Sequence, residues 1–444
     1  MKNVICFLLV MIIIFNFIAC KKDTTGGQLQ ITEISANHGS YGSTMTITVN
    51  NFSAGKDTIK INGMPCNVTG IQGSEITIDI PKASGSGYIT ITDGTTILKG
   101  PPFKYIYTCN VTTLAGSLDS GSVDGTGLGA SFLHLDGVAV SSTGILYTTE
   151  FTGDNQYIDT YSASSRIRQI NAAGVVTTFS GSGHYGFQDG PASVAGFGDL
   201  ATIAIDAVGN LYVTDYYYNR IRKITTTGDV STIAGNGNAG FVDGPADSAS
   251  FDGPTGVTLD AIGNVYVADN GNVCIRRISP DGMVTTLTDK GFISLTNASQ
   301  NHVIFESPWA LCFDLQGNLL VGDKGNIWKT SLSGTKDFFY STDDGPHPDG
   351  FSYNNGIGRI TGLVVDSHGN VYASDLDYSV IYQISIYGTN IFAGIPGQYP
   401  GQFLPFSDGP LLTATFINPS QLALDIDDNL YIADGYRMRK IAIQ

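Results

Sequence analysis

Basic side chains are scarce in this sequence of 444 residues. Lys and Arg number 23 against 39 Asp and Glu, the formal net charge is −16, and no segment gathers the basic residues into a cluster. Proteins that bind nucleic acid carry a basic patch that meets the phosphate backbone. The composition therefore argues against a nucleic-acid partner, and an acidic surface serves mainly solubility.

Helical patterns and cysteine pairs are also scarce. Only 14% of the residues are charged, 55 are Gly, and no stretch has the pattern of a long amphipathic helix, which favours an all-β chain. Of the six cysteines, two fall in the first 20 residues. The other four have no metal-type spacing, so we expect buried free thiols rather than bridges: Cys66, Cys109, Cys274 and Cys312.

Motifs for catalysis are missing as well. The histidines do not form the cluster that a catalytic zinc needs, and no nucleophile elbow, phosphate loop or paired-histidine motif is present. We therefore expect a non-catalytic protein without a cofactor. A divalent cation bound by carboxylates near Asp136 and Asp199 remains an alternative.

What the chain does contain is a repeat. Its clearest copy runs FDGPTGVTLDAIGNVYVADNGNVCIRRI from residue 251 to 278, with two short strands around a Gly263-Asn264 turn and a third strand after a polar loop. The acid that ends the second strand recurs at intervals of 52 to 65 residues, and all-β units of this period are typical of propeller blades. These acids are Glu150, Asp215, Asp269, Asp323, Asp375 and Asp434. Because they recur in each blade, we expect them to be structural rather than catalytic.

The ends of the repeat predict how the ring closes. A complete unit has a fourth strand, as at 176–179, but the chain ends at 439–443 with a third strand. The missing fourth strand is found at 111–114. We therefore predict six blades, the last completed by a strand from the first segment, which hides both open edges of the ring.

The blade pattern resembles the NHL repeat, most clearly over residues 234–278. The resemblance covers residues 109–444 and implies a six-bladed β-propeller of NHL type, although blade 4 departs from the pattern at 324–328. It implies no single function, since propellers host unrelated activities. Similar propellers include metal-dependent lyases and lactonases, so such an enzyme is one alternative.

Residues 29–108 differ in character. Short alternating strands lie between Gly, Asn and Pro turns and predict a small immunoglobulin-like β-sandwich. The order of His38–Ser43, Asn51-Phe52 and Ile61-Asn62-Gly63 resembles an IPT/TIG domain, which implies a spacer or docking module. We expect a semi-rigid connection to the ring near residues 105–110.

The first 20 residues are predicted to be a targeting segment. Lys2 precedes an apolar run from Val4 to Ala19, which is too short to span a membrane stably. The sequence Phe17-Ile18-Ala19-Cys20 resembles a bacterial lipoprotein signal, which implies a lipid on Cys20; an ordinary secretory signal is the alternative. Residues 21–28 would be a tether. We expect a lipid-anchored protein of the cell envelope, on the outer membrane, that contacts the membrane only through its anchor.

One face of the ring is predicted to be the working surface. The loops after the terminal acids and the connections between blades lie on that face and hold the excess length, and binding sites occupy variable loops on rigid scaffolds. Its loops carry several aromatic residues, Tyr185 among them; the best cluster is Tyr216-Tyr217-Tyr218, and Tyr161 is a further candidate. Flat rings beside polar side chains suit sugars, but they also suit protein interfaces.

A second set of candidates lies where the innermost strands begin. Aligning the six blades gives one level of residues at the mouth of the channel and a second level below it. The first level is His134, Asp199, Gly253, Ser307, Arg359 and Asn418, and the second is Asp136, Ala201, Thr255, Trp309, Thr361 and Ser420. These side chains either read a polar ligand or line a wet channel. From the whole sequence we expect a non-catalytic envelope protein that binds a glycan or similar polymer; the alternatives are a scaffold for another envelope protein and the enzyme named above.

Overall fold

The computed structural model describes residues 29–82, 84–151, 165–288, 305–330, 332, 336–341, 357–385, 388–395 and 405–443. The predicted signal, Cys20 and the tether lie outside these residues, and so does Tyr161. In the described ranges no helix has the length and apolar character needed to cross a bilayer.

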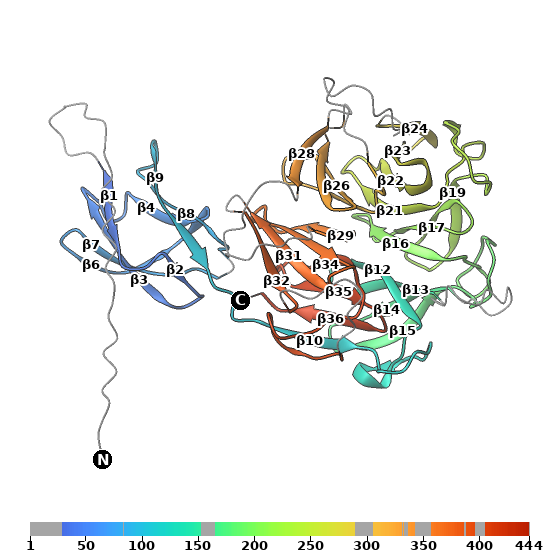
Figure 1. The fold of residues 1–444 in the computed structure, drawn as a ribbon, viewed down its shortest axis with the longest axis horizontal. Coiled ribbons are helices and arrows are strands. Elements are labelled where there is room, and N and C mark those ends of the chain that lie inside the picture. Colours follow the sequence, from blue (N-terminus) through green and yellow to red (C-terminus); the bar gives the residue numbers. More distant parts are fainter. Residues whose placement is uncertain are drawn as a thin grey trace, which may run out of the picture.

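The described residues form eight β-sheets, and their helical content is limited to two short 3-10 turns, η1 (Gly127–Gly129) and η2 (Asn270–Asn272). Figure 1 shows the sandwich in blue beside the larger propeller, which runs from teal to red. The predicted all-β fold, a small immunoglobulin-like sandwich followed by a six-bladed propeller, is confirmed.

The sandwich buries alternate residues of its strands. In β3 (Thr44–Asn50), Met45, Ile47 and Val49 are buried while their neighbours are not, as expected of a strand with one face on a core. One sheet has the order β1 (Gln30–Ile34), β3, β7 (Glu75–Asp79), β6 (Asn67–Gln72). The other has the order β2 (His38–Gly39), β9 (Ile97–Tyr105), β8 (Gly87–Thr92), β4 (Thr58–Ile61), β5 (Met64–Pro65).

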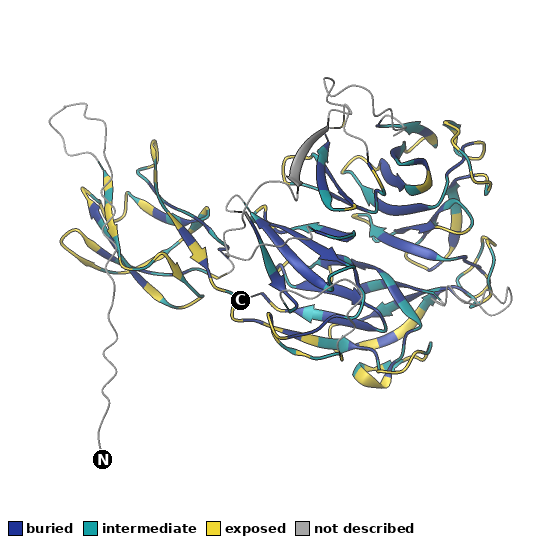
Figure 2. Ribbon diagram, in the orientation of Figure 1, coloured by how far each residue is buried: buried dark blue, intermediate teal, exposed yellow. Residues whose placement is uncertain are grey.

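The remaining six sheets are the blades. Their innermost strands contact one another in a closed cycle, β12, β16, β21, β25, β29, β34 and back to β12. Figure 2 shows that buried residues are concentrated in the propeller strands, whereas exposed residues lie on turns and outer edges.

Blade 1 contains β12 (His134–Val140), β13 (Leu146–Phe151), β14 (Arg166–Ile170), β15 (Val175–Ser180) and β11 (Gly125–Thr126). Blade 2 contains β16 (Leu200–Ile205), β17 (Leu211–Asp215), β18 (Arg220–Ile224) and β19 (Val230–Ala234). Blade 3 contains β21 (Pro254–Leu259), β22 (Val265–Asp269), β23 (Cys274–Ile278), β24 (Met283–Thr286) and β20 (Gly244–Pro245). Blade 4 contains β25 (Ala310–Phe313), β26 (Leu319–Asp323), β27 (Asn326–Thr330) and β28 (Lys336–Ser341). Blade 5 contains β29 (Ile360–Val365), β30 (Val371–Asp375), β31 (Val380–Ser385) and β32 (Gly388–Ala393). Blade 6 contains β34 (Pro419–Leu424), β35 (Leu430–Asp434), β36 (Arg437–Ile441), β10 (Asn110–Ala115) and β33 (Gly409–Pro410).

Strand β10 closes the ring as predicted. It pairs antiparallel with β36, Val111 opposite Ile441 and Thr112 opposite Lys440, so the first strand of the propeller completes the last blade. Figure 1 shows β10, in teal, running beside the red strands of blade 6.

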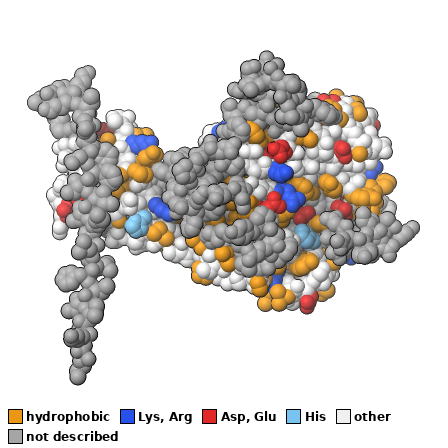
Figure 3. Space-filling model, in the orientation of Figure 1, with side chains coloured by type: hydrophobic (Ala, Val, Ile, Leu, Met, Phe, Trp, Pro, Cys, Tyr) orange, Lys and Arg blue, Asp and Glu red, His pale blue; other side chains and the backbone are white. Residues whose placement is uncertain are grey.

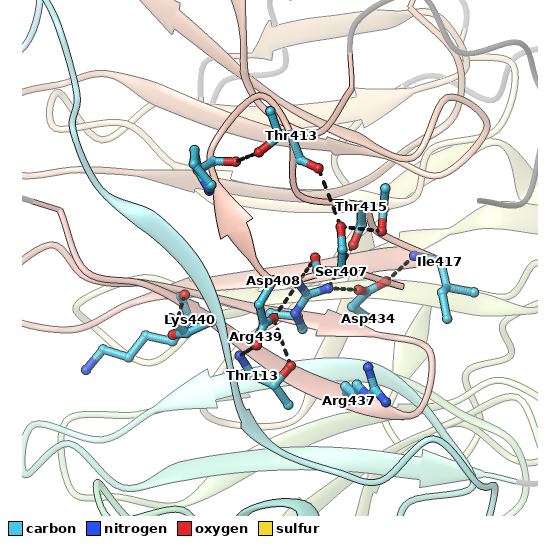
Figure 4. A network of polar contacts seen from close by, with 12 residues as sticks. Thr113, Ser407, Asp408, Thr413, Thr415, Ile417, Asp434, Arg437, Arg439 and Lys440 are labelled. Atoms are coloured by element: carbon cyan, nitrogen blue, oxygen red, sulfur yellow. Dashed lines mark hydrogen bonds and ion pairs between the residues drawn. The ribbon is translucent and has the colours of Figure 1, made fainter. Parts of the chain in front are cut away.

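Each terminal acid forms contacts that stabilise its own blade. In blade 3, Arg276 is fully buried between Asp269, at 2.8 Å, and Asp243, at 2.6 Å. Figure 4 shows the same arrangement in blade 6, where Arg439 lies between Asp434 and Asp408. These contacts support the prediction that the recurrent acids are structural.

The Asp-Gly-Pro triplets differ from expectation. From the sequence alone, the Asp of such a triplet is expected to cap nearby N–H groups and the Pro to end a strand. Instead, Asp243 accepts the backbone N–H of Thr286, 43 residues away, and Gly244–Pro245 pairs with β24 as a short edge strand. Proline is tolerated at this edge because no further strand requires the backbone N–H that it lacks.

The hairpin turns contain an acid that the sequence interpretation overlooked. Asp260 accepts the backbone N–H groups of Ile262 and Asn264, and its second oxygen accepts the Asn264 amide and the Tyr266 hydroxyl. Gly263 has φ of +87°, which explains the glycine at this position. The equivalent acids in other blades are Asp206, Asp314, Asp366 and Asp425.

None of the four cysteines in the described residues forms a disulfide, which agrees with the expected thiols, and Cys109, Cys274 and Cys312 are buried. Burial raises the pKa of the partly exposed Cys66 thiol to about 12, so little of it is thiolate near neutral pH.

Tyr107 connects the sandwich to the ring. Its ring packs edge-on against Tyr105 of β9 and against Phe392 of β32, with centroids 4.8 and 5.1 Å away. The Gln383 amide donates to its hydroxyl at 2.8 Å, and burial raises the pKa of Tyr107 to about 12. These contacts agree with the predicted semi-rigid connection.

Candidate functional site

The candidate site lies on the loop face, which we define as the face where the innermost strands begin and where the loops after the terminal acids lie. Strand register places the first-level residues together: Leu200 pairs with Asp215, Pro254 with Asp269 and Pro419 with Asp434. Asp199, Gly253 and Asn418 immediately precede these partners and are therefore equivalent. The predicted first level, which we call the mouth, is supported by the register.

Most residues of the second level do not line a water-filled channel. Thr255 and Thr361 are buried, and their hydroxyls donate to the carbonyls of Pro308 and Pro419 in the next blade. The expectation of a water-lined channel is wrong at these positions, because the hydroxyls join neighbouring blades. Ala201 and Ser420 are also buried, and their carbonyls accept hydroxyls from Thr149 and Ser374.

Gln421 crosses between blades directly below the mouth. Its side-chain oxygen accepts the backbone N–H groups of Val138 in blade 1 and Ile203 in blade 2, both at 3.0 Å, and its amide donates to the Ile203 carbonyl. One side chain of blade 6 thus ties three innermost strands together. The mouth therefore has a polar floor at blades 6, 1 and 2.

Two carboxylates and a histidine gather at the mouth between blades 1 and 2. The Asp136 carboxylate lies 3.5 Å from His134 Nδ1, and both side chains are about four-fifths buried, with 21% and 20% exposed. Burial lowers the pKa of His134, but Asp136 and the Asp434 carboxylate outweigh it, and the net direction is upward. Burial, and next the charge of Asp136, raise the pKa of Asp199. Asp136 lies in β12 and Asp199 immediately precedes β16. These neighbouring innermost strands approach closely here, since a Cβ on Gly137 would lie 3.0 Å from the Ala201 carbonyl oxygen.

Aromatic rings extend this group outward. Tyr185, Tyr217 and Tyr218 lie in mutual contact, with ring centroids 5.1 to 5.3 Å apart, and Phe187 packs on Tyr218 at 5.1 Å. Burial, and then the charge of Asp199, raise the pKa of Tyr185. The Tyr216 backbone N–H donates to the Asp199 carbonyl at 2.9 Å, so the loop that contains Tyr217 and Tyr218 lies beside Asp199. We call Tyr185, Tyr217 and Tyr218, with Asp136 and Asp199, the acid–tyrosine patch.

The rings of the patch are open to a ligand to different degrees. Tyr217 is 47% exposed, while Tyr185 and Tyr218 are partly buried. The neighbouring Tyr216 is 43% exposed and turns the other way, with its ring over Gly253 of blade 3. The three consecutive rings therefore do not act as one cluster.

The other predicted residues lie elsewhere on the ring. Arg359 belongs to blade 5, where its guanidinium contacts Asp377 at 3.2 Å. Trp309 is partly buried at the start of blade 4, and its backbone N–H donates to Gly322. Figure 3 shows acidic, basic and histidine side chains near the middle of the propeller in this view. The fold thus brings together His134, Asp136, Asp199, Tyr217 and Tyr218, but not Arg359 or Trp309.

Phe187 was absent from the predicted site, and Tyr185 was expected only among the aromatic residues of the loops on this face, not among the chosen candidates. Tyr185 lies in the sequence HYGFQDGP, where blade 3 has NAGFVDGP, so a tyrosine replaces Ala239 of the repeat. Such a departure from an otherwise repeated segment was a usable signal. Phe187 matches Phe241 of the repeat and therefore gave no such signal.

The patch does not provide a metal centre by itself. Over the described ranges, no three His, Cys, Asp or Glu side chains are close enough together to hold a metal ion. Asp136, Asp199 and His134 therefore offer charge and hydrogen bonding to a ligand rather than a complete ligand set.

Comparison with known proteins identifies the sandwich. Residues 29–105 match the family model of the IPT/TIG domain. Among curated proteins, the chain is 39% identical over 88 residues to Protein SUPPRESSOR OF QUENCHING 1, chloroplastic, of Arabidopsis thaliana, covering 19% of this chain and 8% of that protein. It is 26% identical over 283 residues to Teneurin-1 of Gallus gallus, covering 54% of this chain and 10% of that protein. The chain therefore spans a tenth or less of these relatives.

Solved structures match nearly the whole chain. A protein of unknown function from Bacteroides thetaiotaomicron has a TM-score of 0.59 at 19% identity, covering 95% of this chain and 99% of that one. An auxiliary nutrient binding protein from Bacteroides ovatus has a TM-score of 0.52 at 16% identity, covering 94% and 98%. At such identity the likeness concerns the fold. Residues 29–105 are thus an IPT/TIG domain, and the rest of the described chain forms a six-bladed β-propeller.

Proposed function

We propose that this protein is a non-catalytic lipoprotein of the bacterial cell envelope, and that its NHL-type propeller binds a glycan or similar polar polymer through the loop face. Cys20 would carry the lipid, at the outer membrane, and the IPT/TIG domain would hold the propeller away from the bilayer. The fold relationship to an auxiliary nutrient binding protein agrees with a binding role.

The acid–tyrosine patch is the observation on which the proposal rests. Sugar rings present an apolar C–H face and a rim of hydroxyls. Tyr217 offers an exposed flat ring on a loop that is joined to Asp199 by the hydrogen bond from the Tyr216 N–H to the Asp199 carbonyl. A carboxylate accepts hydrogen bonds from hydroxyls and, on a rigid scaffold, orients the stacked ring. Because blades fix both groups, little ordering is needed on binding.

The direct test is affinity electrophoresis of the protein through gels that contain single polysaccharides. We expect a retarded band with at least one glycan. No retardation with any member of a broad panel would contradict the proposal and favour the alternative of a protein-interaction scaffold, for which cross-linking would reveal a partner. A chelator-sensitive turnover would favour the enzyme alternative.

A further inference from the structure

The carboxylates of the acid–tyrosine patch are not neutralised by a lysine or arginine. In the part of the chain that the structure describes, Asp136 contacts only His134 among possible cations, and Asp199 forms no ion pair. By contrast, the acids that stabilise the blades are paired with buried arginines, as Asp215 is with Arg222 at 3.1 Å. Two partly buried acids at neighbouring innermost strands, with His134 beside Asp136 as the one possible cation among the described residues that contact them, raise the free energy of the unliganded site.

The basic side chains of the surrounding loops already have other contacts. Arg359 is held by Asp377, and Arg220 lies over the Phe187 ring at 4.2 Å from its centroid. Arg166 lies between Ser122 and Glu150. In the described ranges none of them forms an ion pair with Asp136 or Asp199, so these carboxylates are open to a cationic ligand.

The rings beside these acids also favour a cation. The faces of tyrosine rings carry negative electrostatic potential and attract ammonium groups, by about 0.5–1 kcal/mol at exposed sites and more when water is excluded. Tyr185, Tyr217 and Tyr218 form one cluster of rings from two loops, and the Tyr217 ring is 47% exposed. The Tyr216 N–H donates to the Asp199 carbonyl. The formal charge of −16 further attracts cations to the whole molecule.

We propose that the glycan bound by this site carries free amino groups, with a protonated ammonium held by Asp136 and Asp199 and a sugar ring stacked on Tyr217. This inference rests on the proposed glycan-binding function and narrows it to amino sugars without N-acetyl groups. An acetylated nitrogen has no charge and would leave both carboxylates uncompensated.

The test compares hexasaccharides of equal length by calorimetry on the full-length protein in detergent. We expect the glucosamine hexamer to bind at least about tenfold more tightly than the N-acetylglucosamine hexamer or cellohexaose. Asp199→Asn should remove most of that preference. The matched control is Asp281→Asn, which changes an exposed acid in a turn of the opposite face and should leave it intact.

The outcomes separate the two claims. Equal binding of charged and neutral hexamers, or an Asp199→Asn variant with an undiminished preference, would overturn the amino-sugar inference and leave glycan binding in place. Binding of a hexalysine peptide with no hexasaccharide bound would overturn both in favour of a protein ligand. No binding by any glycan class would overturn the proposed function itself.

Discussion

Four arginines, one each in blades 1, 2, 3 and 6, are completely buried between an acid of the second strand and an acid of the preceding loop. A buried charge is tolerated only when it is paired and hydrogen bonded, and each of these also packs over a phenylalanine ring, as Arg276 does over Phe251. They are Arg168, Arg222, Arg276 and Arg439.

Removing one of these arginines should therefore be costly. Arg276→Ala leaves Asp269 and Asp243 without their cation, and we expect a loss of about 3–5 kcal/mol in the free energy of unfolding. Urea denaturation measures it. The control is Arg277→Ala on the same strand, a partly exposed position where less than about 1 kcal/mol is expected. Equal losses in both variants would contradict the structural role of the network.

For single residues, the sequence predicted that the repeated acids are structural, but it did not predict which side chains they contact. Asp269 and Arg276 are seven residues apart on neighbouring strands, where register brings them together. Asp243 lies 33 residues before Arg276, and only the folded blade places it there. Repetition reveals a shared role, whereas the partner depends on strand pairing.

Blade 5, like blade 4, lacks the buried arginine of blades 1, 2, 3 and 6. In the register of β30 and β31, Tyr382 occupies the position that Arg276 has in blade 3. Asp375 is nevertheless buried, and it accepts the backbone N–H groups of Gly358, Asp377 and Tyr378. Burial raises the pKa of Asp375 from 3.8 to about 6.

This raised pKa predicts a specific pH dependence. Between about pH 4 and pH 6 the carboxyl is ionised in the unfolded chain but protonated in the folded one, so the folded state binds more protons. The stability that Asp375 contributes is therefore present at low pH and lost as the pH rises to about 6, a change on the order of 3 kcal/mol. Relative to Asp375→Asn, the wild type should lose about this much between pH 4 and pH 7.

Urea unfolding of the wild type and of Asp375→Asn between about pH 4 and pH 7 measures the difference in their free energies of unfolding. Groups present in both proteins, such as Asp215, contribute equally to both values and cancel from the difference. The Asp281→Asn variant should run parallel to the wild type, since that acid is exposed. Parallel curves for Asp375→Asn as well would show that Asp375 ionises normally in the folded protein.

The blades themselves were largely predictable, because alternation and Gly-Asn turns mark each strand and its hairpin. The edge strands formed by Gly244–Pro245 and Gly409–Pro410 were not, since proline argues against a strand unless its missing N–H lies at an edge. Whether the backbone N–H position of a residue faces a partner strand or the open edge is known only from the assembled sheet.

Closure of the whole ring depends on β10. Thr113 of this strand donates its backbone N–H to Asp408, which also contacts Arg439, so β10 joins both the sheet and the buried network of blade 6 (Figure 4). Without β10, the edge of β36 would be open to pairing with other chains.

Truncation tests this closure. A chain that begins at Thr108 keeps β10 and should remain monomeric with a cooperative thermal transition. A chain that begins at Ser117 lacks it and should aggregate or melt about 10 °C lower or more. Size-exclusion chromatography and thermal scans compare the two, and identical behaviour would refute the closing role.

The site shows where sequence-based prediction of the whole molecule ends. The mouth could be aligned because each blade begins its first strand at the same point, and His134, Asp136 and Asp199 were found in this way. The exclusion of Arg359 and the inclusion of Tyr185 depend on which loops meet across blades. Thr255 was assigned to a channel, yet it bonds to the next blade, because adjacent innermost strands lie closer than a repeat pattern reveals.

The central claim is that the acid–tyrosine patch binds a glycan, and one pair of variants tests it most directly. Tyr217→Ala removes a ring that is 47% exposed in the patch, and Tyr41→Ala removes one that is 55% exposed on the sandwich. With a glycan that retards the wild type, the account predicts that Tyr217→Ala lowers affinity by about 5- to 30-fold, from the loss of about 1–2 kcal/mol of stacking, while Tyr41→Ala binds normally. Unchanged binding by Tyr217→Ala, or an equal loss in both variants, would contradict it.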